Sequence, residues 1–322
     1  MTKKVKLLDI IPIVILLVLV AAFAILSKGT TLSGYNLSNM MVQVVPVIIG
    51  SLGVIFVVSL GGTDISIGAS AAMCSTVAAL VAGRFGSWLL LPVTLILTMA
   101  VGLCVGLLVS KCRVSSFMTT LALLIACRGF LNFLLSSQVV YTPSGLEFMS
   151  STGFAVTLLV VAIVVIFFVF EKTKFGYYCK CIGENERTVR SVGTNVDRIR
   201  ITCFVLSGLF AGIVGVTQMC RVGGSSPTLC NMLEMRVQMA IFLGGILTTG
   251  GFSAKLYKVI IGSITITVIE NGLTICRASS AVSEAVEGIL LVIILCTTIY
   301  FNNVSEKHTV RLSTNSTMDV EA

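Results

Sequence analysis

Hydrophobic residues along this chain form long continuous runs separated by short polar stretches, rather than an alternating pattern. Most runs hold 18 or more residues, which is enough for a helix to cross a hydrocarbon core about 30 Å thick. A spanning β-barrel would instead show alternating segments of about ten residues. The pattern predicts an all-α polytopic membrane protein with about ten transmembrane helices. The predicted spans are residues 8–26, 39–59, 64–82, 88–110, 116–135, 153–170, 199–218, 236–249, 256–275 and 284–301.

Two of these runs are less regular than the others. The run 64–82 opens with polar residues and glycines, and the run 236–249 is short and interrupted by glycines. Irregular backbone is tolerated at membrane depth only where protein or a cavity covers it. We therefore expect one or two broken or re-entrant helices here.

Two glycine pairs occur at a spacing of four residues, Gly102 with Gly106 and Gly208 with Gly212. Residues at this spacing share one face of a helix, and glycines there let two helices approach closely. The pairs predict close helix packing along the spans 88–110 and 199–218.

The composition agrees with a membrane protein. Of 322 residues, 56% are hydrophobic and only 11% are charged, against about a quarter in soluble domains. The values exclude a cytosolic enzyme. The chain has no GxxxxGK[ST] phosphate-binding loop, and its sole histidine, His308, lies in a polar tail, so a His-based metal site or triad is excluded. We expect one transmembrane domain over residues 1–322, with a tail at 303–322 and no catalytic residue, metal or cofactor.

The basic residues predict the orientation in the membrane. With a cytoplasmic N-terminus and ten spans, sixteen Lys and Arg residues fall on the inner side and five on the outer side, while Arg128 lies inside a span. Cytoplasmic loops of membrane proteins carry such an excess. We therefore expect both termini in the cytoplasm, and the net charge of +8 needs no nucleic acid to explain it.

The longest charged stretch between two apolar runs covers residues 175–200. Because it lies between two spans and on the predicted cytoplasmic side, we expect this loop to present its charges to a soluble partner. Its charged residues include Glu184, Glu186, Arg187 and Arg190.

Polar residues also occur where the chain should cross the membrane. Gly61 and Gly62 let the backbone break, and Asp64, followed by Ser66, could accept amide groups at the start of the next helix. A broken element at membrane depth also lines a cavity in many transporters. The block is either a helix cap or part of a solute pathway.

Arg128 lies in the middle of a span, one turn before Asn132, and a second polar stripe contains Glu270 and Asn271. A charge at this depth faces the interior of the bundle or an aqueous path in most membrane proteins. Arg128 is therefore either a structural anchor, pairing with carbonyl groups or an acid, or a lining residue of the pathway. Glu270 is one acid that Arg128 could neutralise.

Several short motifs occur in an order that resembles a known family. The motifs are Gly61–Gly68, Arg128–Gly129, Phe175–Glu186, Gly193–Val196, Pro227–Thr228 and the double glycines at 244–245 and 250–251. With them the chain resembles, from about Asn36 to Tyr300, the membrane permease subunits of bacterial ribose/xylose/galactose-type ABC importers, the monosaccharide branch related to the branched-chain amino acid permeases.

The resemblance implies a permease homodimer in the bacterial plasma (inner) membrane. It also implies an ATP-binding cassette ATPase as partner, an extracytoplasmic solute-binding protein, and a coupling helix at 184–197. The residues that would couple to the ATPase are Gly183, Glu184, Asn185, Glu186, Arg187, Arg190, Gly193 and Asn195. Such a subunit carries a monosaccharide or related small polar solute and does no chemistry of its own. Its expected pathway residues are Gly61, Gly62, Asp64, Ser66, Arg128, Asn132, Pro227, Glu270 and Asn271.

Two positions depart from the family pattern. Arg236 stands where relatives often carry an aspartate, and Glu287 where they often carry a base, so we hypothesise an ion pair with reversed polarity between them. The rival interpretation is a stand-alone secondary transporter with Glu270 as its coupling acid. That interpretation leaves the charged segment at 184–200 without a role.

Overall fold

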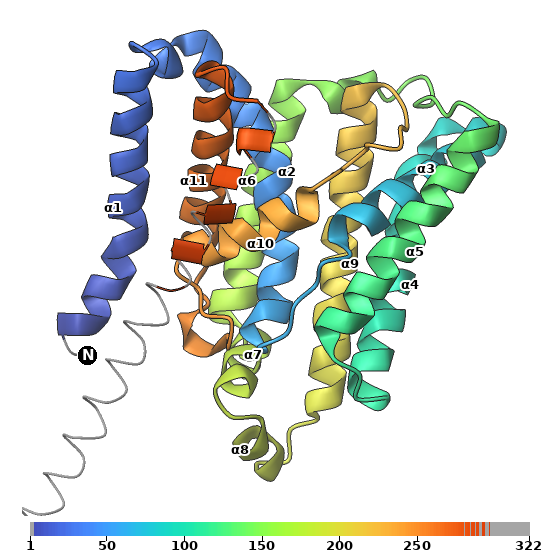
Figure 1. Cartoon of the computed structure of the whole chain (residues 1–322). Helices are drawn as coiled ribbons and strands as arrows, with labels where there is room; N and C mark the ends of the chain where they lie inside the picture. The colour runs from blue at the N-terminus through green and yellow to red at the C-terminus, as the bar shows by residue number, and fades with distance from the viewer. Residues whose placement is uncertain are drawn as a thin grey trace, which may run out of the picture.

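The structure, a computed structural model, describes residues 3–279, 281–283, 285–286, 288–289, 292–293 and 296. Within these residues the chain is helical and carries no strand, apart from one isolated bridge between Tyr141 and Gly224 (Figure 1). The expected all-α class is confirmed. The long helices are α1 Lys3–Leu26, α2 Gly34–Ser59, α3 Ile67–Phe85, α4 Leu90–Lys111, α5 Ser116–Ser137, α6 Thr152–Ile166, α9 Val196–Val222 and α11 Leu256–Ile275. The shorter elements are η1 Thr30–Leu32, η2 Ser87–Leu89, η3 Glu147–Ser150, the π-helical η4 Phe167–Lys172, α7 Lys174–Glu184, α8 Glu186–Ser191, α10 Leu233–Leu243 and η5 Gly251–Ser253.

Seven helical stretches in the described part of the chain are long and apolar enough to cross a membrane. They are Gly34–Ser59, Ile67–Phe85, Ser87–Lys111, Ser116–Ser137, Thr152–Lys172, Val196–Val222 and Leu256–Ile275. Each coincides with an expected span. A shorter apolar stretch, Ile10–Leu26, lies within α1. Most of the tenth expected span, 284–301, and the whole tail at 303–322 lie outside the described residues, so the count of ten stays a prediction.

Both irregular runs contain a break, as expected. The chain leaves α2 at Ser59 and takes no helical structure between Gly62 and Ser66 before α3 begins at Ile67. The run 236–249 holds all but the first three residues of the 11-residue helix α10, followed by a turn through the glycines at 244–245. Figure 1 shows α3 beginning, and α10 lying, at mid-height of the bundle.

Helix α2 forms the centre of the bundle. All its residues from Val44 to Ser59 are buried, and it packs against α9, α10, α11 and α6. Continuous burial explains why this span is apolar on every face. The predicted glycine contacts are confirmed between α4 and α9, since a Cβ at Gly102 would overlap with the carbonyl of Phe204 and one at Gly208 with that of Thr98.

The bundle has two ends, which carry different features. The end that holds the start of α1 and the small helix α8 is called here the α8 end, and the other, which holds η1 and the segment around η3, the opposite end (Figure 1).

Candidate solute cavity and docking arm

The charged segment at 175–200 is a compact helical arm rather than an open loop. It consists of α7, α8 and the first turns of α9. Each of the three helices begins at a side-chain cap: the Thr173 hydroxyl and the Asn185 and Asn195 amide oxygens each accept a hydrogen bond from a backbone N–H in the first turn. Gly193 has φ +82°, which a residue with a Cβ rarely adopts, and it closes the turn after α8.

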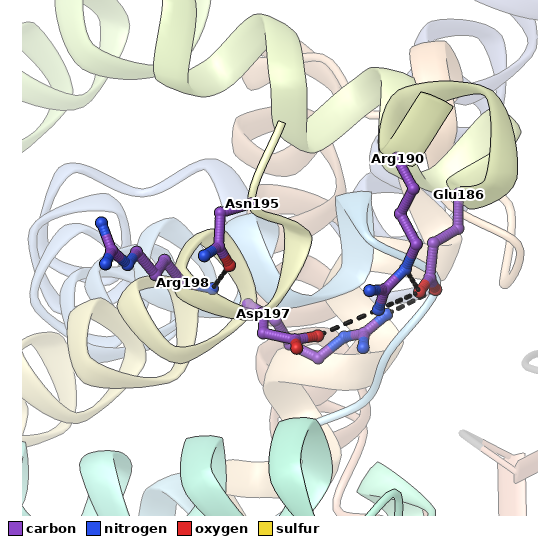
Figure 2. A network of polar contacts seen from close by, with 6 residues as sticks. Glu186, Arg190, Asn195, Asp197 and Arg198 are labelled. Atoms are coloured by element: carbon purple, nitrogen blue, oxygen red, sulfur yellow. Dashed lines mark hydrogen bonds and ion pairs between the residues drawn. The ribbon is translucent and has the colours of Figure 1, made fainter. Parts of the chain in front are cut away.

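Four charged side chains hold α8 against the start of α9 (Figure 2). The Arg190 guanidinium lies 2.8 Å from Glu186 and 2.9 Å from Asp197, and Arg200 lies 2.7 Å from the other oxygen of Glu186. Burial opposes ionisation of Glu186, but the hydrogen bonds and charges of the two arginines outweigh it, and the pKa of Glu186 is lowered. The carboxylate therefore stays ionised at neutral pH.

A small apolar cluster lies beneath these ion pairs. Ile182, Val189 and Val196, one from each helix of the arm, are buried together. Arg187 in the first turn of α8 is exposed, and Val192, the residue that follows α8, is 70% exposed. The arm is thus rigid at its base and presents Arg187 and Val192 outward.

Two further residues expected to contact a partner make contacts inside the chain. The Glu184 carboxylate accepts a hydrogen bond from the Phe252 N–H at 2.9 Å. A Cβ at Gly183 would overlap with the Ser59 carbonyl and the Gly251 amide, so only a glycine fits there without a shift. Gly183 and Glu184 fasten the arm to the bundle.

A cavity of about 560 Å³ lies near the opposite end, between α2, α9, α10 and α11. A second cavity of about 330 Å³ shares Pro46, Gln218 and Arg236 with it. The first cavity is lined by Gln43, Pro46, Gln218, Arg221, Met232, Met235, Arg236, Met239, Glu270, Thr274, Ala278 and Ser283.

An ion pair lies in the wall of this cavity. Arg236 Nε of α10 is 2.7 Å from Glu270 Oε1 of α11, and the arginine side chain is 43% exposed. Arg221 donates a hydrogen bond to the Val42 carbonyl at the rim. Glutamines and charged groups of both signs, set among methionines, can hydrogen-bond hydroxyls while packing on an apolar face. The chemistry suits a small polar solute.

Arg128 lines none of the three described cavities. Of the two roles considered for it, structural anchor or pathway lining, its contacts favour the anchor. Its guanidinium donates to the Leu229 carbonyl at 2.8 Å and to the Cys230 carbonyl at 2.7 Å. The Glu234 carboxylate lies 3.7 Å away and makes no hydrogen bond through Oε2 within the described residues. The suggestion that Arg128 neutralises Glu270 is wrong. Glu270 of α11 pairs with Arg236 of α10, whereas the carboxylate near Arg128 of α5 is that of Glu234.

Asp64 is also enclosed by protein. One of its oxygens accepts the backbone N–H and the hydroxyl of Ser66, and the other accepts the Ser207 hydroxyl of α9 at 2.6 Å. Its backbone carbonyl accepts a hydrogen bond from the Gln238 amide of α10. Asp64 joins the break before α3 to two other helices. Sequence reasoning missed Gln238 and the cavity residues Gln43 and Gln218, since isolated amides in apolar runs form no motif.

The remaining expected pathway residues are spread over the bundle. Asn271 and Asn36 exchange two hydrogen bonds and tie α11 to α2, while Asn132 and Pro227 are exposed. Gly61 and Gly62 line a separate cavity of about 480 Å³ at the α8 end. Glu287 lies outside the described residues, so its pairing with Arg236 stays a prediction.

An all-helical membrane bundle with a polar cavity near one end and a rigid arm at the other defines a multi-pass membrane transport protein. Residues 36–295 match the family model described as branched-chain amino acid transport system / permease component, and the chain belongs to this family. The expected resemblance is confirmed.

Individual relatives narrow the branch of the family. The chain is 26% identical to the ribose import permease protein of Escherichia coli (strain K12), over 87% of this chain and 90% of the relative. It is 29% identical to the ribose import permease protein of Bacillus subtilis (strain 168), over 88% and 90%. It is 28% identical to the galactose/methyl galactoside import permease protein of E. coli (strain K12), over 87% and 90%. None of the solved structures matches this chain.

Proposed function

We propose that this chain is the permease subunit of an ATP-driven importer and forms the translocation pathway for a monosaccharide or related small polar solute. The names of its relatives support the solute class. The observation that carries the proposal is the cavity of about 560 Å³ with the Arg236–Glu270 pair in its wall. A gradient-driven carrier is not favoured, since Glu270 is already paired with a cation and the arm has a helical structure suited to docking.

The two ends of the bundle would serve two partners. We place an ATP-binding cassette ATPase against α8, with Arg187 and Val192 in the contact, and an extracytoplasmic solute-binding protein at the opposite end. Basic residues support this orientation, because the arm and the α4–α5 turn carry many of them while the opposite end carries few. Both termini are then cytoplasmic.

A second copy of the chain would complete the pathway. The face of α5 that carries Asn132 is exposed in this single chain, and a polar amide on an apolar helix gains a partner when another helix covers it. We place the homodimer contact on this face. Glu270 and Arg236 would meet the solute, while Asp64, Arg128 and Asn271 shape the wall from behind.

The test is co-purification with the products of the neighbouring genes. Arg187→Glu should abolish retention of an ATPase subunit, whereas the matched Arg84→Glu at the opposite end should retain it. ATP-dependent uptake of labelled ribose or galactose by the reconstituted complex would complete the case. Uptake by the chain alone under an ion gradient, with no ATPase retained, would overturn it.

A further inference from the structure

Glu171 is the one acidic residue in the π-helical turn η4, and its two oxygens serve two different elements. Oε2 accepts a hydrogen bond from Lys180 Nζ of α7 at 2.6 Å, and Oε1 accepts one from the backbone N–H of Leu256 at 3.1 Å. Leu256 is the first residue of α11, and the residue before it supplies no side-chain cap. Glu171 therefore caps α11 and binds α7 at the same time.

The last turn of α7 is fastened to the same segment. Glu184 holds the Phe252 N–H, and Gly183 packs its backbone against Gly251. Residues 251–256 are thus held by two carboxylates that flank α7 in the chain, Glu171 in η4 before the helix and Glu184 as its last residue. Both carboxylates accept backbone N–H groups of this segment, at Phe252 and at Leu256, so the segment is held at two points. We expect it to move together with α7.

The Glu171 contact is also costly to open. Lys180 is only 8% exposed, and its ammonium lies 4.5 Å above the centre of the Phe170 ring. Without Glu171 this ammonium would lose its nearest anion in a largely desolvated place, which is strongly unfavourable. The contact is expected to persist while the arm moves.

Helix α11 reaches from this junction to the solute cavity. Glu270 lies fourteen residues after Leu256, which corresponds to about 21 Å along a helix axis. Its ion pair with Arg236 joins α11 to α10 at the cavity wall. A displacement at Leu256 therefore changes the position of Glu270 against Arg236.

We infer that Glu171 is a positioning residue that joins α7 of the docking arm to α11. A push on α8 then reaches the solute cavity through α11 as well as through α9. The inference rests on the proposed function, because it supposes that a partner pushes on α8. It assigns to the pathway a residue that touches neither ATPase nor solute.

The experiment compares uptake with ATP hydrolysis in proteoliposomes that hold the whole importer, with labelled ribose and galactose as probes. For Glu171→Ala, the sugar imported per ATP hydrolysed should fall about tenfold while ATP hydrolysis stays within twofold. Glu171→Gln, which keeps an oxygen for Leu256, should recover part of the ratio. Glu147→Ala in η3, an exposed acid at the opposite end, is the matched control and should equal the wild type. The inference would be overturned if the sugar imported per ATP hydrolysed did not change, whether both rates stayed the same or fell equally.

A second measurement separates this inference from the proposed function. Hydrogen exchange in the purified chain should speed up about tenfold at residues 252–258 in Glu171→Ala, and the double variant with Lys180→Met serves if the single variant folds poorly. Unchanged exchange overturns the inference even if sugar uptake is established. If exchange is faster in Glu171→Ala but the wild-type importer takes up no sugar, the junction is supported and the proposed function is overturned.

Discussion

Replacing Arg128 with methionine should be among the most damaging single changes in the bundle. The side chain makes two hydrogen bonds to carbonyls of the segment before α10 and is the cation nearest to the buried Glu234. The change keeps a long apolar side chain but removes all three polar contacts. It leaves the start of α10 without its anchor.

The magnitude follows from these contacts. Polar contacts between membrane helices contribute about 0.6 kcal/mol on average and up to about 1.7. Three of them give about 2 kcal/mol at the lower limit. Leaving a buried carboxylate without its partner costs about 3–5 kcal/mol, which sets the upper limit. We expect the free energy of unfolding to fall by about 2–5 kcal/mol.

The assay is reversible unfolding in mixed micelles, with Arg84→Met at the exposed end of α3 as control. The control should stay within about 0.5 kcal/mol of the wild type. Adding Glu234→Gln to Arg128→Met should restore part of the loss, because the stranded carboxylate becomes neutral. The reasoning is refuted if Arg128→Met lies within 0.5 kcal/mol of the wild type, or if the two changes simply add.

Three further outcomes follow from the site. Gly183→Ala should destabilise the chain by about 1–3 kcal/mol through overlap with backbone atoms, while Gly83→Ala, which has open space, should not; equal melting temperatures would contradict this. Because the pKa of Glu186 is lowered, its ion pairs should persist at neutral pH and loosen only as the pH falls below about 4.5, as hydrogen exchange across α8 would show; loosening near pH 6 would count against it. Arg236→Glu should impair sugar uptake, and adding Glu270→Arg should recover part of it, whereas no recovery would separate the pair from transport.

The sequence predicted the membrane spans well because burial in lipid demands long apolar runs. It also located the breaks before α3 and in 236–249, since glycines and polar residues are costly inside a regular span. These are local signals, and each is visible within about twenty residues of the chain.

The partners of polar residues were harder to predict, since they depend on contacts far apart along the chain. Arg128 binds carbonyl groups 101 and 102 residues away, and nothing in its own span tells an arginine with such partners from one that lines an aqueous path. Asp64 was expected either to cap the next helix or to line a pathway; it accepts the N–H of Ser66 just before α3, and its bond to Ser207 crosses 143 residues. Glu171 has no motif at all, because its partners are a lysine nine residues on and a backbone amide.

The three side-chain caps of the docking arm have a kinetic consequence. Since Thr173, Asn185 and Asn195 begin α7, α8 and α9 without help from another protein, the surface offered by α8 exists before any encounter. A partner then bears no entropy loss for ordering this segment. Association should be limited by orientation, at about 10⁵–10⁷ M⁻¹s⁻¹. Substitutions of the uncharged Val192 should then alter how long the complex lasts rather than how fast it forms.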